Sequence, residues 1–180
     1  MGDPHFPRKK YSSPRNPWRS DQLSQELFLV GTFGLRNKRE LWKAQTKLSQ
    51  IRKQARSMLA APSEERVESE QLLHASLQTR GIIHQEATIE DVLKLTIEDI
   101  LERRLQTVVW RKGLATSPHQ ARQRITHGHI LIANRVVTIP GYTVTTQEEQ
   151  TARLRDNSPL HRQIATEAPS QQTATEAPSS

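Results

Sequence analysis

The chain has 180 residues, enough for one or two small domains, and a lean composition in which 34% of residues are hydrophobic and 4% aromatic. Its net charge of +7 points to a polyanionic partner, either nucleic acid or an anionic membrane surface. The absence of cysteine excludes disulfides and cysteine-ligated zinc. No apolar run approaches the roughly 18 residues of a membrane span, and residues 1–10 lack the apolar core of a signal peptide. We therefore expect an intracellular soluble protein without a membrane partner.

Charge is distributed unevenly along the chain. Residues 1–56 carry 13 basic and 4 acidic residues, whereas residues 57–102 carry 3 basic and 10 acidic ones. Residues 103–145 carry 7 basic residues and no acidic residue. A solvated surface is the alternative for any single charge run, but two basic blocks separated by an acidic one favour contact with a polyanion.

The first predicted element, residues 1–20, is a basic extended arm. It contains four prolines and five basic residues and cannot pack on its own. Trp18 near its end argues mildly against a solvated tail, since such tails are poor in aromatic residues. The arm's candidates for contact with a phosphate backbone are Arg8, Lys9, Lys10, Arg15, Trp18 and Arg19.

Residues 21–100 are predicted to be helical, basic over 21–56 and acidic over 57–100. Leu41, Leu48 and Ile51 recur at helical spacing after an interruption at Gly31 and Gly34. The basic residues of this helix could reach successive phosphates, because positions four apart share one face. They are Arg36, Lys38, Arg39, Lys43, Lys47, Arg52, Lys53 and Arg56.

The tetrapeptide Thr-Ile-Glu-Asp occurs at residues 88–91 and again at 96–99. Each copy predicts a helix start, with a threonine cap and acidic residues in the first turn, where the helix dipole favours them. Metal ligation or acid–base chemistry is the weaker interpretation, because capping already explains the type and position of these residues. We expect no metal site.

The region from 101 to 145 is predicted to be a compact module. An apolar stripe over residues 97–108 predicts one continuous helix, ended by Gly113. Ser117 can cap a second helix, which stops at Gly128, and short β-rich runs over residues 130–139 predict a hairpin. The expected fold class is α+β and mostly helical: a basic helical N-terminal region followed by a small helix–helix–β-hairpin module.

Several segments of this region resemble the S-four RNA-binding module, namely residues 101–109, 113–115, 120–123, 127–130 and 139–144. Upstream, residues 17–18 and 34–42 resemble the small-subunit ribosomal protein S-four family in its archaeal and eukaryotic branch. The resemblance covers about residues 14–144 in order, so it is far more specific than one motif. It departs at the hairpin turn, where Ala133-Asn134-Arg135 replaces the usual Asn-Gly or Asp-Gly.

The resemblance implies a structural protein that binds small-subunit ribosomal RNA directly, nucleates assembly of the subunit body and supports decoding accuracy near the messenger entry path. The implied location is cytoplasmic, within the small subunit. Implied partners are this RNA, neighbouring small-subunit proteins, including the S-five family protein, and messenger RNA at the entry channel. No cofactor and no enzymatic activity are implied.

Carried onto this chain, the first module helix would present Arg103, Thr107 and Arg111 on one face, with Arg104 beside them. Arg104 pairing with Glu102 or Asp99 is an equally weighted alternative. The remaining module candidates are Lys112, His119, Arg122, Gln123, Arg124, His127 and Arg135. We expect contacts to phosphate, ribose and RNA shape, because the module offers no aromatic platform for unpaired bases.

Two other functions compete: an RNA-binding regulator, and an accessory subunit of an RNA-modifying enzyme, since some such enzymes carry a similar module. The helical region lacks an acid–base constellation, which argues against an enzyme. We expect residues 146–180 to be a polar, disordered tail, because they carry little apolar bulk and contain a repeat of Ala-Thr-Glu-Ala-Pro-Ser.

Overall fold

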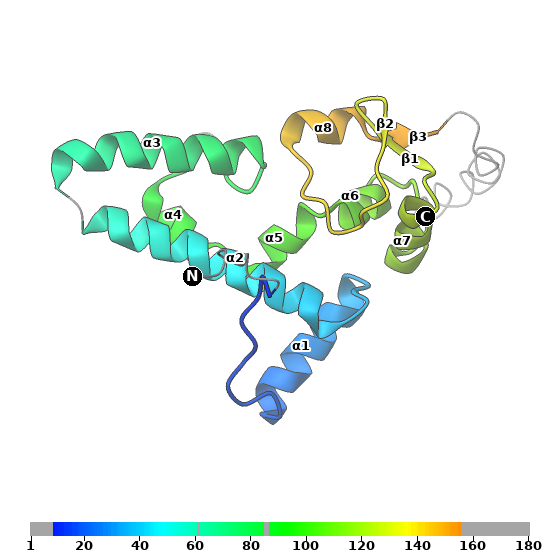
Figure 1. Ribbon diagram of the computed structural model, residues 1–180, viewed down its shortest axis with the longest axis horizontal. Coiled ribbons are helices and arrows are strands. Elements are labelled where there is room, and N and C mark those ends of the chain that lie inside the picture. The colour runs from blue at the N-terminus through cyan, green and yellow to red at the C-terminus, as the bar shows by residue number, and fades with distance from the viewer. Residues whose placement is uncertain (1–8, 61, 85–86, 156–180) are drawn as a thin grey trace, which may run out of the picture.

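The computed structural model describes residues 9–60, 62–84 and 87–155, without the side chains of residues 63–65. These residues form eight helices and three short strands (Figure 1), as the α+β, mostly helical expectation requires. Arg8 and the predicted tail beyond residue 155 lie outside the described residues. No helix in the described part is long and apolar enough to cross a membrane.

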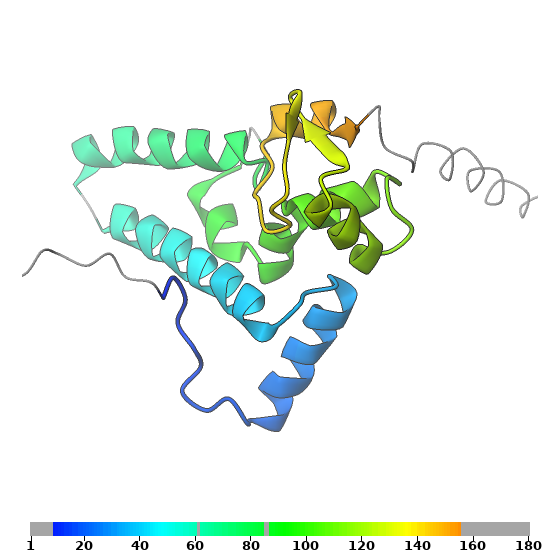
Figure 2. The ribbon, with the colours of Figure 1, turned by 45° about the vertical axis from the view of Figure 1, so that its right-hand side comes forward.

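Helix α2 (Lys38–Leu59) is the longest element of the N-terminal half. Its first turn is capped by Asn37, whose side chain accepts the backbone N–H of Glu40. The predicted apolar stripe is buried from Leu41 to Ala55. Helix α1 (Ser20–Thr32) packs against α2 from one side, and α3 (Ser63–Thr79) returns along the other (Figures 1 and 2).

The two Thr-Ile-Glu-Asp segments begin helices α4 (Ile89–Lys94) and α5 (Ile97–Glu102), as predicted. In each, the aspartate accepts the backbone N–H of the capping threonine, at 3.0 Å for Thr88 and 2.7 Å for Thr96. These are capping boxes, so the carboxylates serve the local structure. Among the described residues no group of three or more His, Cys, Asp or Glu side chains could hold a metal ion.

The prediction of one continuous helix across residues 97–112 is wrong. Helix α5 ends at Glu102, and α6 (Leu105–Arg111) begins after an extended Arg104 with ψ 141°. The extended backbone pairs with a segment 40 residues later: Leu105 N–H donates to Tyr142 O at 2.8 Å, and Val144 N–H donates to Arg103 O at 2.9 Å. These long-range hydrogen bonds replace helical ones that the local pattern favoured.

The C-terminal half contains α7 (Pro118–Thr126), β1 (Ile130–Ile132), β2 (Arg135–Val136), α8 (Thr146–Thr151) and β3 (Arg153–Leu154). The strands form an antiparallel sheet of order β2-β1-β3. Both residues of the β1–β2 turn, Ala133 and Asn134, have positive φ angles of 46° and 66°, which is typical of a tight type I′ hairpin. Because α8 and β3 complete this unit, the predicted boundary at residue 145 is too early.

Two apolar cores meet at the α5–α6 junction. The first gathers α1 to α5, from Phe33 to Leu101, and the second gathers α6 to β3, from Leu105 to Leu154. Leu101 and Leu105 are both fully buried on either side of the break. The extended turn between them therefore orients the basic helix α2 relative to the C-terminal unit.

Candidate nucleic-acid interface

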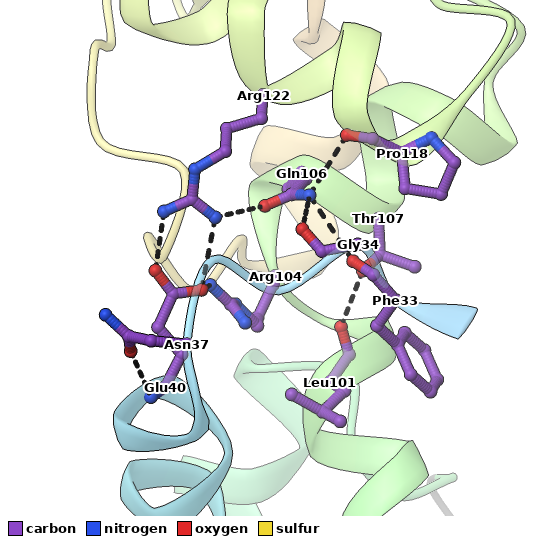
Figure 3. Close-up of polar contacts among 10 residues, drawn as sticks. All are labelled: Phe33, Gly34, Asn37, Glu40, Leu101, Arg104, Gln106, Thr107, Pro118 and Arg122. Atoms are coloured by element: carbon purple, nitrogen blue, oxygen red, sulfur yellow. Dashed lines mark hydrogen bonds and ion pairs between the residues drawn. The ribbon is translucent and has the colours of Figure 1, made fainter. Parts of the chain in front are cut away.

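A polar network centred on Glu40 joins the start of α2 to the C-terminal unit (Figure 3). One oxygen of this carboxylate lies 2.8 Å from Arg104 Nη2, and the other lies 2.5 Å from Arg122 Nη2. Burial would raise the pKa of Glu40, but the hydrogen bonds and charges of Arg122 and Arg104 outweigh it and lower that pKa to about 2. A single carboxylate from α2 thus pairs with two arginines of the acid-free segment, and the group keeps one net positive charge.

Gln106 extends this network through the interior. Its Nε2 donates to the carbonyls of Gly34 at 2.8 Å and Pro118 at 3.0 Å, and its Oε1 accepts from Arg122 Nη1 at 3.2 Å. Gly34 has a φ of +58°, and a Cβ built there would lie 2.7 Å from Pro118 Cβ. The α1–α2 loop and α7 therefore approach each other at a distance only glycine permits.

Two more arginines of the acid-free segment are paired with acids from outside it. Arg103 Nη2 lies 2.8 Å from Glu149, and its Nε donates to the carbonyl of Arg80. Arg111 pairs with Glu102 at 2.5 Å. Together with Arg104 and Arg122, four of the seven basic residues of this segment are thus paired within the chain, with three carboxylates. The alternative that Arg104 pairs with Glu102 or Asp99 is wrong about the partner, because Arg104 pairs with Glu40.

Thr107 and Arg124 are not on the surface, so the expectation that they face a ligand is wrong. Thr107 is 2% exposed, and its hydroxyl donates to the carbonyl of Leu101 across the helix break. Arg124 is 3% exposed and donates to the carbonyl of Leu114. Both side chains hold local backbone in place.

The free positive charge lies instead on α2. Arg39, Lys43 and Lys47 are exposed at four-residue spacing, about 6 Å apart along the helix axis. Lys43 and Lys47 line a hollow of about 300 Å³ that continues past Glu40 to Arg104 and Arg122 and is bordered by residues 139–141 and Thr143. Lys47 also lines a second hollow of about 550 Å³, which reaches Arg80 and contains no acidic residue among its described lining. We call these two hollows the basic groove.

Lys47 occupies the point where the two hollows meet. Its ammonium lies 3.3 Å from the hydroxyl of Thr143, a neutral partner. Desolvation and the like charges of Arg80, Arg104 and Lys43 lower the pKa of Lys47. Arg104 Nη1 is buried beside the groove without a hydrogen-bond partner among the described residues. Glu40 lines the first hollow too, but its single negative charge is shared between Arg104 and Arg122, so net positive charge remains here, an arrangement that an anion would relieve.

The other predicted contact residues divide by exposure. Lys38 and Arg52 are half-buried, and both have partners within the chain. Lys38 pairs with Glu26 at 3.2 Å, and Arg52 donates to the carbonyl of Leu95 at 2.6 Å. The exposed ones are Lys9, Lys10, Arg15, Trp18, Arg19, Arg36, Lys53, Arg56, Lys112, His119, Gln123, His127 and Arg135. These are spread over the arm, α2 and the C-terminal unit, and the basic groove brings together only part of the predicted set.

The described part of the arm folds back along α2, a contact that the sequence did not reveal. Tyr11 stacks on Trp42 with ring centroids 5.9 Å apart, and Lys9 Nζ lies 5.2 Å from the centre of the Tyr11 ring. The backbone N–H of Ser12 donates to the hydroxyl of Thr46. Trp18, in contrast, is 85% exposed. Tyr11 and Trp42 are far apart in the sequence, so no local pattern of residues predicted that their rings would stack.

The S4 domain family model matches residues 103–149, so the chain is an S4-domain protein. The matched span includes α8, in agreement with the boundary seen in the fold. The chain as a whole is similar to the small ribosomal subunit protein uS4 of Hyperthermus butylicus, at 48% identity over 97% of this chain and 99% of that protein. The uS4 proteins of Ignicoccus hospitalis, at 50% identity over 88% and 96%, and of Nitrosopumilus maritimus, at 47% over 96% and 88%, are comparably similar.

Likeness at this level over nearly the whole length of both chains extends beyond the S4 domain to the helical half. The chain belongs to the uS4 family of small ribosomal subunit proteins.

Proposed function

We propose that this chain is a structural constituent of the small ribosomal subunit that binds small-subunit ribosomal RNA directly. The observation that carries the proposal is the basic groove, in which Lys43, Lys47 and Arg104 face a shared hollow with one already neutralised carboxylate, Glu40. A phosphate backbone supplies the missing negative charge. The exposed lysines and arginines of the arm and α2 extend this surface.

In this proposal Arg104 and Arg122 hold other elements of the fold in position. Arg104, Arg122 and Gln106 fix α2 against the S4 domain, so that cations from two elements line one groove. Contacts of this kind read the shape and backbone of folded RNA rather than base identity.

The finer assignment follows the family. Within the small subunit, in the cytoplasm, the chain nucleates assembly of the subunit body. It also supports decoding accuracy near the messenger entry path. Its proposed neighbours are other small-subunit proteins, the S-five family protein among them, with messenger RNA at the entry channel. The proposed role is structural and involves no catalysis.

The groove is tested by salt-dependent binding of the full chain to small-subunit ribosomal RNA. The double variant Lys43→Ala/Lys47→Ala should weaken binding and reduce the slope of log affinity against log salt by about 1 per lysine. The control Arg66→Ala/Lys94→Ala removes the same number of cations from α3 and α4, outside the groove, where each is paired with a carboxylate of its own helix, and should leave the slope unchanged. An unaltered slope in the groove variant would remove the groove from the interface.

Cosedimentation separates the proposal from its alternatives. A structural constituent stays with small subunits through a moderate salt wash. A free-standing RNA-binding regulator, or an accessory subunit of an RNA-modifying enzyme, is mostly released into the supernatant. Release of most of the chain would therefore refute the proposal.

A further inference from the structure

The outward face of α1 carries large apolar side chains that nothing in the described residues covers. Leu27 is 55% exposed and its neighbour Phe28 is 69% exposed. Ser24 and Gly31 flank them on the same face, and a Cβ added at Gly31 would meet nothing within 4 Å. Figures 1 and 2 both show α1 projecting from α2 on the side opposite α3. Small residues around Phe28 leave room for another chain to approach closely.

The opposite face of α1 is firmly held, so this exposure is not a sign of a loosely packed helix. Glu26 is 3% exposed, accepts from Trp42 Nε1 at 3.1 Å and pairs with Lys38 at 3.2 Å. Leu29 and Val30 pack against the N-terminal core. These contacts fix the orientation of α1. Its inner face is occupied by Glu26, Leu29 and Val30, so Phe28 points outward.

The outward face of α1 carries no basic residue. The 26 lysines and arginines of the sequence include none between Ser20 and Thr32. The exposed charges on and beside this face are those of Asp21 on α1 and of Glu98, which lines a hollow of about 420 Å³ together with Ser24, Phe28 and Leu29. The exposed Arg19 lies just before the helix, outside the lining of this hollow. A phosphate backbone would be repelled here, whereas an apolar side chain flanked by lysine or arginine fits both the hollow and the carboxylates.

We infer that the outward face of α1 docks a neighbouring protein of the assembled subunit, which places an apolar side chain against Phe28 and basic side chains toward Asp21 and Glu98. A helix of 13 residues offers a strip about 20 Å long and 10 Å wide. Such a strip is far smaller than the roughly 800 Å² per partner of a stable free-standing pair. The contact therefore forms inside a larger assembly and not as a dimer of this chain. It rests on the proposed function only in requiring that assembly.

Site-specific cross-linking in intact small subunits tests the inference. A photoreactive benzoylphenylalanine replaces Phe28 in one preparation and Gln50, which is exposed in the basic groove, in another. After irradiation of purified subunits, Phe28 should yield a protein adduct whose cross-linked peptide is apolar with adjacent lysine or arginine, and Gln50 should yield an RNA adduct. An RNA adduct, a second copy of this chain, or no adduct at Phe28 overturns the inference. A missing RNA adduct at Gln50 speaks against the proposed function instead.

A second variant guards against failed incorporation. Leu27→Ser/Phe28→Ser removes the apolar surface from exposed positions, so the isolated chain should keep its thermal midpoint and its affinity and salt slope for ribosomal RNA. Dissociation of the variant from small subunits should be about tenfold faster, as expected for loss of an aromatic anchor. Unchanged dissociation, or weaker RNA binding by the isolated variant, contradicts a protein contact at α1.

Discussion

Replacing Glu40 with glutamine should cost about 3 kcal/mol of stability at neutral pH. The amide keeps the shape of the side chain but removes the charge that pairs with Arg104 and Arg122, whose side chains are only 10% and 21% exposed. The pKa of Glu40 falls from its ordinary 4.5 to about 2, and a difference of that size converts to about 3 kcal/mol. Breaking one side of a buried ion pair has a similar cost, because the remaining charges stay desolvated.

The lowered pKa of Glu40 also predicts how the stability of the chain depends on pH. Because the folded-state pKa lies below the unfolded value, the carboxylate contributes fully above about pH 5 and loses its contribution as the pH falls from 4.5 through 2. Urea denaturation of the parent and Glu40→Gln at pH 7 and near pH 2 measures this: the difference should shrink to under about 1 kcal/mol. The control Glu68→Gln, exposed on α3, should stay within about 0.5 kcal/mol of the parent. A Glu40 variant as stable as the parent at pH 7, or a deficit that persists in acid, would refute the reasoning.

Two further substitutions test close contacts by thermal denaturation. Gly34→Ala should destabilise the chain by about 2 kcal/mol or more, because its φ of +58° disfavours alanine and the added Cβ would lie 2.7 Å from Pro118 Cβ. An unchanged thermal midpoint would mean that the α1–α2 loop moves freely away from α7. Ala133→Asn should stabilise the chain by up to about 1 kcal/mol, because asparagine tolerates the positive φ of 46° better than alanine does; a lower midpoint would contradict the turn geometry.

Features that depend on neighbouring residues were readable from the sequence. The Thr-Ile-Glu-Asp segments formed the predicted capping boxes, because a cap involves residues three apart. The turn at Ala133-Asn134 also formed despite its unusual first residue. These elements required no knowledge of the rest of the fold.

Features that depend on distant residues were missed. The segment 103–145 lacks acids, yet Glu40, Glu102 and Glu149 reach its arginines from outside. The break before Leu105 likewise depends on hydrogen bonds to residues 142–144. A charge count along the chain therefore overestimated the free charge of the S4 domain, because it could not show which arginines are paired.

The late strand β3 has a practical consequence for anyone isolating the S4 domain. It covers one edge of β1 and is paired to it at Ile130 and Leu131, while Leu154 adds to the core beneath. A fragment cut at residue 145 would leave that edge open beside an apolar surface, a template for intermolecular strand pairing and precipitation. Stopping after Arg155, whose backbone N–H still bonds His129, keeps the sheet closed on that side.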